Sequence, residues 1–140
     1  MVDTRFETQA LALPPAIPQL RHEVIRYAES LGAQPDTLES LQLAVSEALT
    51  NVVVHAYVGR EPGPMIVEAF EEDEHLLVRV YDDGPGLIPR LDSPGLGLGI
   101  GLMASMANDF NIANRDGTPG TIVSLRFTLS EAACCVLPQA

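Results

Sequence analysis

The stretch VSEALTNVVVHAY, residues 45–57, decides the fold of this chain, because it combines a buried helix face with a row of polar side chains. Its Ala, Leu and Val residues follow the spacing of a helix that packs on a core. Glu47, Asn51 and His55 recur at every fourth position, so a helix places them in one row beside the apolar stripe. Such a row is either a solvated flank or the wall of a binding pocket.

Composition and charge limit what the chain does. It has 140 residues, of which 46% are hydrophobic, so it can bury an ordinary single core. We expect one domain over residues 1–140, with a core from about residue 4 to 129 and a C-terminal tail over 130–140. The formal net charge of −11 repels phosphate backbones and anionic membranes. Direct binding to nucleic acid or membrane is therefore disfavoured, and a basic protein partner fits better.

The ends of the chain carry no targeting or zinc-binding pattern. The N-terminal MVDTRFETQA lacks the apolar core of a signal peptide, and no apolar run approaches the roughly 20 residues that cross a bilayer. Cys134 and Cys135 are adjacent, so they cannot join distant parts of the chain, and a second pair for a zinc site is missing. We expect two inert thiols in a reduced cytoplasmic protein.

One strand and two helices are predicted in the first half of the chain. TRFETQALAL (residues 4–13) alternates polar and apolar side chains and predicts a first strand. The apolar residues that follow have helical spacing, with Pro18 in the first turn and Gly32 at the stop. The second helix is expected to begin at Asp36, which forms a capping box with Glu39, and to run to about Tyr57.

Strands in hairpins follow the second helix. MIVEAFEE (65–72) and HLLVRVYD (75–82) predict two strands joined by a turn near Asp73, and DFNIAN (109–114) and TIVSLRFTL (121–129) predict two more. Between the hairpins lie a long Gly- and Pro-rich loop and a short helix, IGLMASMAN (100–108). This order predicts an α+β fold, a two-layer sandwich whose mixed, mostly antiparallel sheet is covered on one face by about three helices.

The polar row of the second helix is a candidate site if it faces a pocket. There, Asn51 would offer a neutral side-chain oxygen to Mg²⁺, which prefers hard oxygen ligands. Glu47 lies one turn earlier and would take a proton from an attacking hydroxyl. His55 is expected to pack or hydrogen-bond near the helix end.

Two glycine-rich stretches are further candidates. A strand delivers Asp82 into a turn whose glycines would let a flat ring approach the backbone, although a simple Asp-Gly turn has the same sequence. GLGLGIGLMASM (95–106) leads directly into a helix, where free N–H groups would cradle a phosphate, or where the glycines would form a hinge. The Walker A ending and the βαβ unit of a dinucleotide-binding fold are both missing.

In their order and spacing, these groups resemble the GHKL, or Bergerat-fold, ATPases. That superfamily has a helix with E-x-x-x-N, a strand ending in D-x-G-x-G, a G-x-G that opens a helix, and a G-T before the last strand. SEALTNVVVHAY (46–57) and GLGLGIGLMASMAN (95–108) are similar to the anti-sigma-factor serine kinases, a small stand-alone branch. The resemblance covers roughly residues 11–127.

The resemblance implies ATP and Mg²⁺ as ligands and gives each matching residue a role. Asn51 matches the family's Mg²⁺ ligand, Glu47 its general base, and Asp82 the acceptor of the adenine amino group. The other matching positions flank the nucleotide, with Thr121 beside the adenine: Gly84, Gly86, Arg90, Gly97, Gly99, Ile100, Gly101, Leu102 and Thr121.

The segment that corresponds to the family's nucleotide lid, Leu87–Leu96, departs from the pattern. It is short, and Arg90 is its single basic residue. Related lids are often longer and bring basic groups to the phosphates. The departure therefore bears on the rate of phosphate transfer more than on nucleotide binding.

The resemblance implies a cytoplasmic ATP-binding anti-sigma factor that sequesters a sigma factor and phosphorylates a Ser or Thr of a STAS-type antagonist. Close relatives imply a homodimer, and the acidic surface is compatible with a basic patch on a sigma factor. The alternative is a catalytically weak nucleotide-binding module that binds partners without phosphate transfer. The ATP-binding part of a sensor histidine kinase is disfavoured, because no helical hairpin with a phospho-acceptor His precedes the first strand.

Overall fold

The computed structural model describes residues 5–85, 101 and 103–129, and its elements follow the predicted order. Their bounds are β1 (Phe6–Leu11), α1 (Ala16–Ser30), α2 (Pro35–Asn51), the π-helical turn η1 (Val52–Ala56), β2 (Pro64–Glu72), β3 (His75–Asp82), β4 (Asp109–Asn114) and β5 (Thr121–Thr128). Gly101 and residues 103–106 form a further short helical segment. The tail over 130–140, with Cys134 and Cys135, lies outside the described residues.

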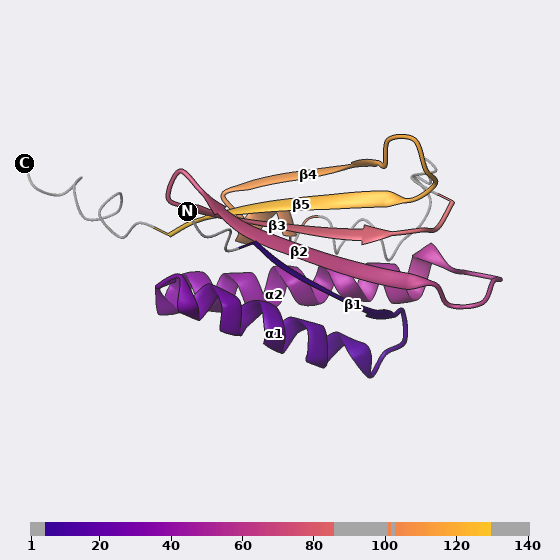
Figure 1. Cartoon of the computed structure of the whole chain (residues 1–140), viewed down its shortest axis with the longest axis horizontal. Coiled ribbons are helices and arrows are strands. Elements are labelled where there is room, and N and C mark those ends of the chain that lie inside the picture. The colour runs from indigo at the N-terminus through magenta and orange to yellow at the C-terminus, as the bar shows by residue number, and fades with distance from the viewer. Residues whose placement is uncertain (1–4, 86–100, 102, 130–140) are drawn as a thin grey trace, which may run out of the picture.

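The five strands form one sheet in the order β1-β2-β3-β5-β4. All of the pairings within it are antiparallel. Figure 1 shows α1 and α2 lying side by side along one face of the sheet. This confirms the predicted α+β sandwich, in which the described strands pair in the antiparallel sense throughout.

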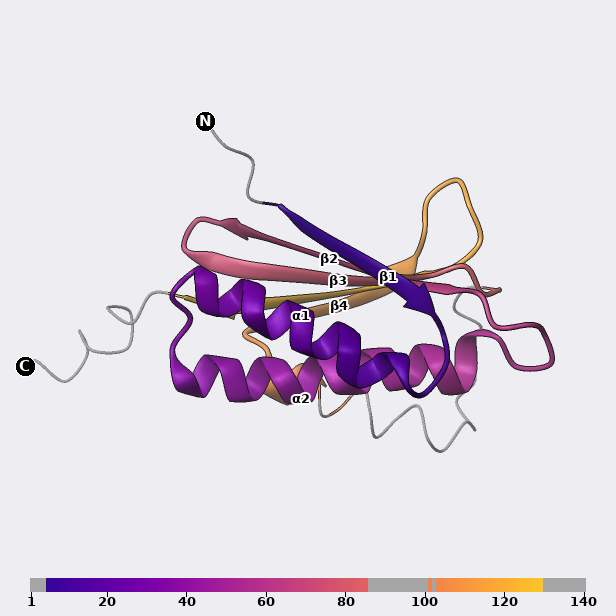
Figure 2. The ribbon, with the colours of Figure 1, turned by 60° about the horizontal axis from the view of Figure 1, so that its bottom comes forward.

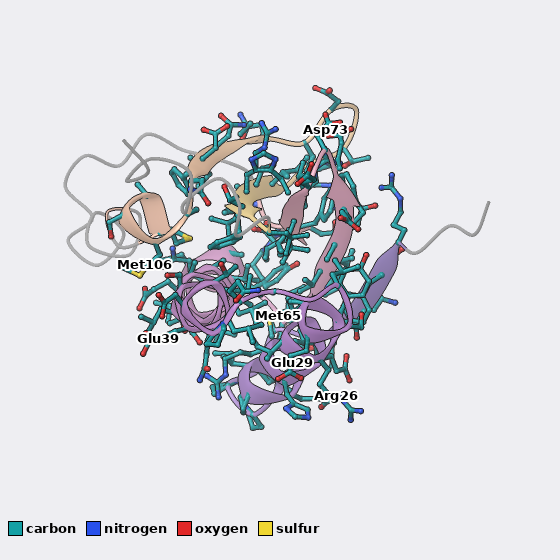
Figure 3. All side chains as sticks on the ribbon, turned by 90° about the vertical axis from the view of Figure 1, so that its left-hand side faces the viewer. Arg26, Glu29, Glu39, Met65, Asp73 and Met106 are labelled. Atoms are coloured by element: carbon teal, nitrogen blue, oxygen red, sulfur yellow. The ribbon has the colours of Figure 1, made fainter. Side chains whose placement is uncertain are left out.

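The core lies between the sheet and the helices. Every second residue along β2 and β3 is buried, as the two-residue period of a strand requires. The helices meet these residues with stripes of fully buried side chains: Leu20, Val24 and Ala28 from α1, and Leu41, Ala44, Val45, Ala48 and Leu49 from α2. In Figure 3, Met65 points into this interior, whereas Arg26, Glu29 and Glu39 lie on the outer side of the helices.

The helix ends agree with the sequence in one case and correct it in the other. Gly32 follows α1 with a φ of 84°, the left-handed conformation that ends a helix, as predicted. The capping box of Asp36 and Glu39 was a wrong prediction, because α2 begins one residue earlier at Pro35 and Gln34 occupies the cap position. Proline, which needs no N–H partner, takes the first helical position and leaves Asp36 inside the first turn. No helix among the described segments is long and apolar enough to span a membrane.

Several segments that are distant in sequence meet at one end of the sheet. β3 ends there at Asp82, and the turn between β4 and β5 and the C-terminal end of α2 lie at the same end (Figures 1 and 2). The candidate residues of α2, of the strand end and of the last turn therefore belong to one region of the molecule.

Candidate functional site

Asp82 supplies a buried carboxylate at this end of the sheet. Only 7% of the residue is exposed, and it is the one charged residue classed as buried within the described part of the chain. Its Oδ1 accepts the N–H of Gly84 at 2.9 Å, and the backbone N–H of Thr121 also donates to the carboxylate. Burial raises the pKa of Asp82, and these two donors oppose the rise. Because a carboxylate accepts about four hydrogen bonds, this one keeps capacity for a ligand N–H group.

Two glycines allow the backbone to approach closely around Asp82. A Cβ on Gly84 would lie 2.4 Å from the carbonyl oxygen of Ala56, at the end of η1. A Cβ on Gly120 would lie 1.9 Å from the carbonyl oxygen of Asp82, and Gly120 has a φ of 128°. Glycine at these positions is therefore a packing requirement of the turn, in addition to any role beside a ligand.

Tyr57 ties the end of the helix to the same turn. Its hydroxyl donates to the carbonyl oxygen of Pro64 at 2.5 Å and accepts the N–H of Asp83 at 2.8 Å. Burial raises the pKa of this hydroxyl, so it stays protonated and able to donate. Arg60 adds a hydrogen bond of 3.2 Å to the carbonyl oxygen of Asp83. The start of β2 and the turn after β3 are thus fixed to the helix end.

The opposite side of the turn is held by the β4–β5 connection. Arg115 donates from Nη1 to the carbonyl oxygen of Asp82 at 3.2 Å and forms an ion pair with the Asp83 carboxylate. Thr121, the first residue of β5, reaches Asp82 through its backbone N–H. The structure therefore brings together three of the predicted site residues, Asp82, Gly84 and Thr121.

The polar row of α2 lies at the edge of the buried layer, as predicted. Glu47 and Asn51 are half-buried, whereas Ala44, Ala48 and Val52 beside them are buried. The Nδ2 atom of Asn51 is buried and has no hydrogen-bond partner among the described residues. An unpaired buried amide costs about 1–3 kcal/mol, so this side chain is suited to meet a ligand.

The helix changes character directly after Asn51. Residues Val52–Ala56 form a π-helical turn, which follows an i→i+5 pattern and is frequent at functional sites. The wider turn rotates His55 away from Glu47 and Asn51, so the predicted row of three ends at Asn51. At a rise of about 1.5 Å per residue, Asn51 lies roughly 7 Å along the helix from Ala56, and Glu47 roughly 6 Å farther. The row therefore leads away from the Asp82 turn, which contacts Ala56.

Most of the predicted phosphate cradle and lid lies outside the described residues: Gly86, Arg90, Gly97, Gly99, Ile100 and Leu102. Their roles, and the lid Leu87–Leu96, stay predictions. Gly101 is described and exposed, and a Cβ there would meet no atom within 4 Å. Packing does not require a glycine at that position, in contrast to Gly84 and Gly120.

A dense metal site is not part of the described structure. Those residues contain no group of three or more His, Cys, Asp or Glu side chains that could hold a metal ion. Mg²⁺ keeps several waters and typically takes one or two protein ligands together with substrate phosphates. Asn51 is compatible with this second kind of site, because its amide is unused inside the fold.

Comparison with known proteins supplies the family. A family model described as "Histidine kinase-like ATPase domain" matches residues 10–127. The chain belongs to this family. It is a GHKL ATPase domain, and the match includes all of α1, α2, β2, β3 and β4.

Individual relatives of this histidine kinase-like ATPase domain carry more specific names. The anti-sigma F factor of Clostridium acetobutylicum is 27% identical over 144 residues, which cover 94% of this chain and 99% of that relative. The serine-protein kinase RsbW of Listeria monocytogenes is 44% identical over 57 residues, which cover 41% of this chain and 36% of that relative. The crystal structure of the RsbU and RsbW domains of a Mycobacterium tuberculosis protein has a TM-score of 0.71 at 21% identity. It covers 91% of this chain, which spans 33% of that longer one, and the likeness shows the fold.

Sequence reasoning missed the residues that hold the Asp82 turn from outside. Tyr57 was read as the helix end, and Arg115 and Gly120 as parts of a turn. Their contacts with Asp82 and Asp83 span 26 to 38 positions in the chain. A signal was available for Gly120, since a Gly directly before Thr121 belongs to the G-T pattern, but no local pattern indicates Tyr57 or Arg115.

Proposed function

We propose that this chain is an ATP-binding anti-sigma factor that sequesters a sigma factor and phosphorylates a Ser or Thr of a STAS-type antagonist. The observation that carries the proposal is a buried carboxylate, Asp82, with an unpartnered buried amide, Asn51, on the neighbouring helix of a histidine kinase-like ATPase domain. The names of the relatives, anti-sigma F factor and serine-protein kinase RsbW, support the choice of partners. We also propose that residues 1–140 act as one domain in the cytoplasm, and homodimerisation stays a prediction.

Asp82 and Asn51 would hold different parts of the ligand. The carboxylate of Asp82 is an acceptor fixed by Gly84 and Thr121, which suits the amino group of adenine. Asn51 would hold Mg²⁺ through its side-chain oxygen, with the nucleotide phosphates and water as the other ligands. When bound, ATP with Mg²⁺ supplies the phosphoryl group, and the residues of this chain hold and orient it. Gly97 and Gly99 would flank the phosphates.

Glu47 would act on the protein substrate. It is half-buried on α2, one helical turn before Asn51 and therefore farther from the Asp82 turn. In this position its carboxylate would accept the proton of the attacking Ser or Thr hydroxyl, a role that typically contributes about 10²–10⁴ in rate.

The kinase proposal is tested with Glu47→Gln, which keeps the size of the side chain and removes the base. The expected protein binds ATP and a sigma factor as the wild type does, but transfers phosphate to the antagonist at least about 100-fold more slowly. The assay is transfer of radiolabelled phosphate to STAS-type proteins encoded near this chain. Glu39→Gln is the matched control, since Glu39 lies exposed on the same helix and should transfer at the wild-type rate.

The alternative function is a nucleotide-gated clamp that binds the same partners without phosphate transfer. One observation favours it: the lid Leu87–Leu96 is short and has a single basic residue, Arg90. If the wild-type chain binds ATP and a sigma factor but labels none of the STAS-type proteins, the clamp is the correct function.

The role of Asn51 has its own test, which does not need a protein substrate. Asn51→Ala removes the proposed oxygen ligand and favours the helix, because Ala is the best helix former. The variant should bind ATP with an affinity that no longer rises with Mg²⁺, as measured by calorimetry. Mg²⁺ dependence at wild-type strength would show that Asn51 is a flank residue of α2.

A further inference from the structure

Arg115 makes an unusual set of contacts for a residue in a turn. Its side chain is 23% exposed and reaches back to β3, 33 positions earlier in the chain. Nη1 donates to the carbonyl oxygen of Asp82 and to the carboxylate of Asp83. The guanidinium carbon lies 5.4 Å from the centre of the Tyr81 ring. Arg115 thus contacts three consecutive residues, which end with the base-binding candidate and its neighbour.

The backbone of the β4–β5 turn prepares this position. The N–H of Arg115 donates to the carbonyl oxygen of Gly120 at 3.0 Å, which closes the turn. A Cβ on Gly120 would lie 2.8 Å from Cδ of Arg115 as well as against the Asp82 carbonyl. The side chain therefore crosses the turn in space that only glycine leaves free.

We propose that Arg115 is a specificity-determining positioning residue, which fixes the main chain at Asp82 so that its carboxylate selects a base with an amino group. The inference rests on the proposed nucleotide-binding function. An acceptor-only carboxylate favours a ring amino group and disfavours a ring carbonyl, but only while its orientation is held. Gly84 and Thr121 hold the carboxylate itself, and Arg115 holds the peptide from which it projects.

The charge of Arg115 is already paired, so the structure favours positioning over attraction of phosphate. Its cation meets the carboxylate of Asp83, and one N–H is used by the Asp82 carbonyl. A residue that attracted phosphate would strengthen the binding of every nucleoside triphosphate. A residue that orients Asp82 acts only on nucleotides whose base meets that carboxylate.

The test compares ATP with purine riboside triphosphate, which lacks the amino group of adenine, on Arg115→Gln. We expect the ATP Kd to rise about tenfold and the Kd of the analogue to change by less than about twofold, because a hydrogen bond to a charged group is worth about that difference. Arg79→Gln is the matched control. It removes the same charge from β3, where Arg79 pairs with Glu68 at 3.6 Å, and should leave the ratio of the two affinities unchanged.

Three outcomes overturn parts of the scheme separately. If Arg115→Gln weakens both nucleotides equally, Arg115 acts on phosphate or on the fold, and the positioning role is wrong while nucleotide binding stands. If the wild type binds neither nucleotide, the proposed function fails and the inference fails with it. If Arg115→Gln does not fold, Asp83→Asn, which keeps the guanidinium and removes its ion-pair partner, must lower the ATP preference by a smaller factor. An unchanged preference in Asp83→Asn overturns the inference.

Discussion

The two ends of β3 carry acidic turns that differ in almost every physical respect. At one end, Asp73 and Glu74 have φ values of 52° and 62° and are exposed, as Figure 3 shows for Asp73. At the other end, Asp82 is buried and its neighbours contact the helix end and the β4–β5 turn. The first turn is a tight hairpin of local origin, whereas the second is held by residues that are distant in sequence.

The difference shows what converts an Asp in a turn into a binding group. Both turns follow ordinary strand residues, and both contain carboxylates. The Asp73 carboxylate is solvated, and only its backbone is used, by His75 Nδ1 at 2.8 Å. The Asp82 carboxylate is desolvated, and its orientation is set by backbone donors on both sides. Long-range contacts, rather than the local sequence, make the second carboxylate suitable for recognition.

The largest expected effect is the loss of stability on adding a methyl group at Gly120. Gly120→Ala places a Cβ 1.9 Å from the Asp82 carbonyl oxygen, at a φ of 128°, and should lower the free energy of unfolding by about 3 kcal/mol or more. Gly117→Ala is the control in the same turn. Gly117 has a φ of 76° but open space around it, so this change should lower the free energy by only about 1–2 kcal/mol. Equal losses in urea unfolding would show that Gly120 serves the turn alone and not its contact with Asp82.

The next effect concerns ATP binding at the two carboxylates. Asp82→Asn replaces an acceptor by a group that also presents donors, and should weaken ATP binding by about 1–3 kcal/mol, roughly 5-fold to 150-fold. Asp73→Asn makes the same chemical change at the exposed turn and should leave the affinity unchanged. Calorimetric titration of both variants checks this, and wild-type affinity in a folded Asp82→Asn protein would refute the assignment of the base-binding residue.

A smaller effect is expected on removing the hydroxyl that fastens the Asp82 turn to the helix. Tyr57→Phe leaves the N–H of Asp83 and the carbonyl of Pro64 without their partner, and should lower stability by about 1–2 kcal/mol. Tyr81→Phe is the control, because that hydroxyl donates to Glu68, which also pairs with arginines and is reached by solvent. We expect a loss of no more than about 0.5 kcal/mol there. Chemical denaturation distinguishes the two, and equal losses would contradict the special role of Tyr57.

The smallest effect is a gain at the other end of β3. Two positive φ values, as in a type I′ turn, favour Asp-Gly, so Glu74→Gly should remove strain and raise stability by about 0.5–1 kcal/mol. ATP affinity should not change, since this end is far along β3 from Asp82. A loss of stability in thermal unfolding would show that the acidic hairpin also depends on contacts of the Glu74 side chain.

The fold was predictable because its signals are periodic and local. Helical spacing in α1 and α2 and alternation in β2 and β3 indicate the elements, and Gly32 indicates a helix stop. The capping box failed because two valid signals compete at the start of α2. Pro35 and Asp36 both suit a helix N-terminus, and the proline, with its fixed φ, takes the first position.

The candidate site was predictable only as far as its motifs reach. Asp82, Gly84 and Thr121 meet as their shared order with the GHKL superfamily implies. The π-helical turn after Asn51 was not foreseen, since the run VVVHA satisfies the apolar spacing of an ordinary helix. Tyr57 and Arg115 were also missed, because their partners lie across the fold, where neither periodicity nor a short motif reports.

The π-helical turn makes the spacing between Asn51 and Tyr57 intolerant of deletion. In an α-helix each residue advances about 100°, so one surplus residue absorbed by the turn changes the angular phase of everything after it by about that amount. Losing one of Val52, Val53 or Val54 would restore a regular helix and swing the Tyr57 hydroxyl and the Ala56 carbonyl off the Asp83–Gly84 turn. A one-residue gap in this helix would thus disconnect the two halves of the site while leaving every site residue in the sequence.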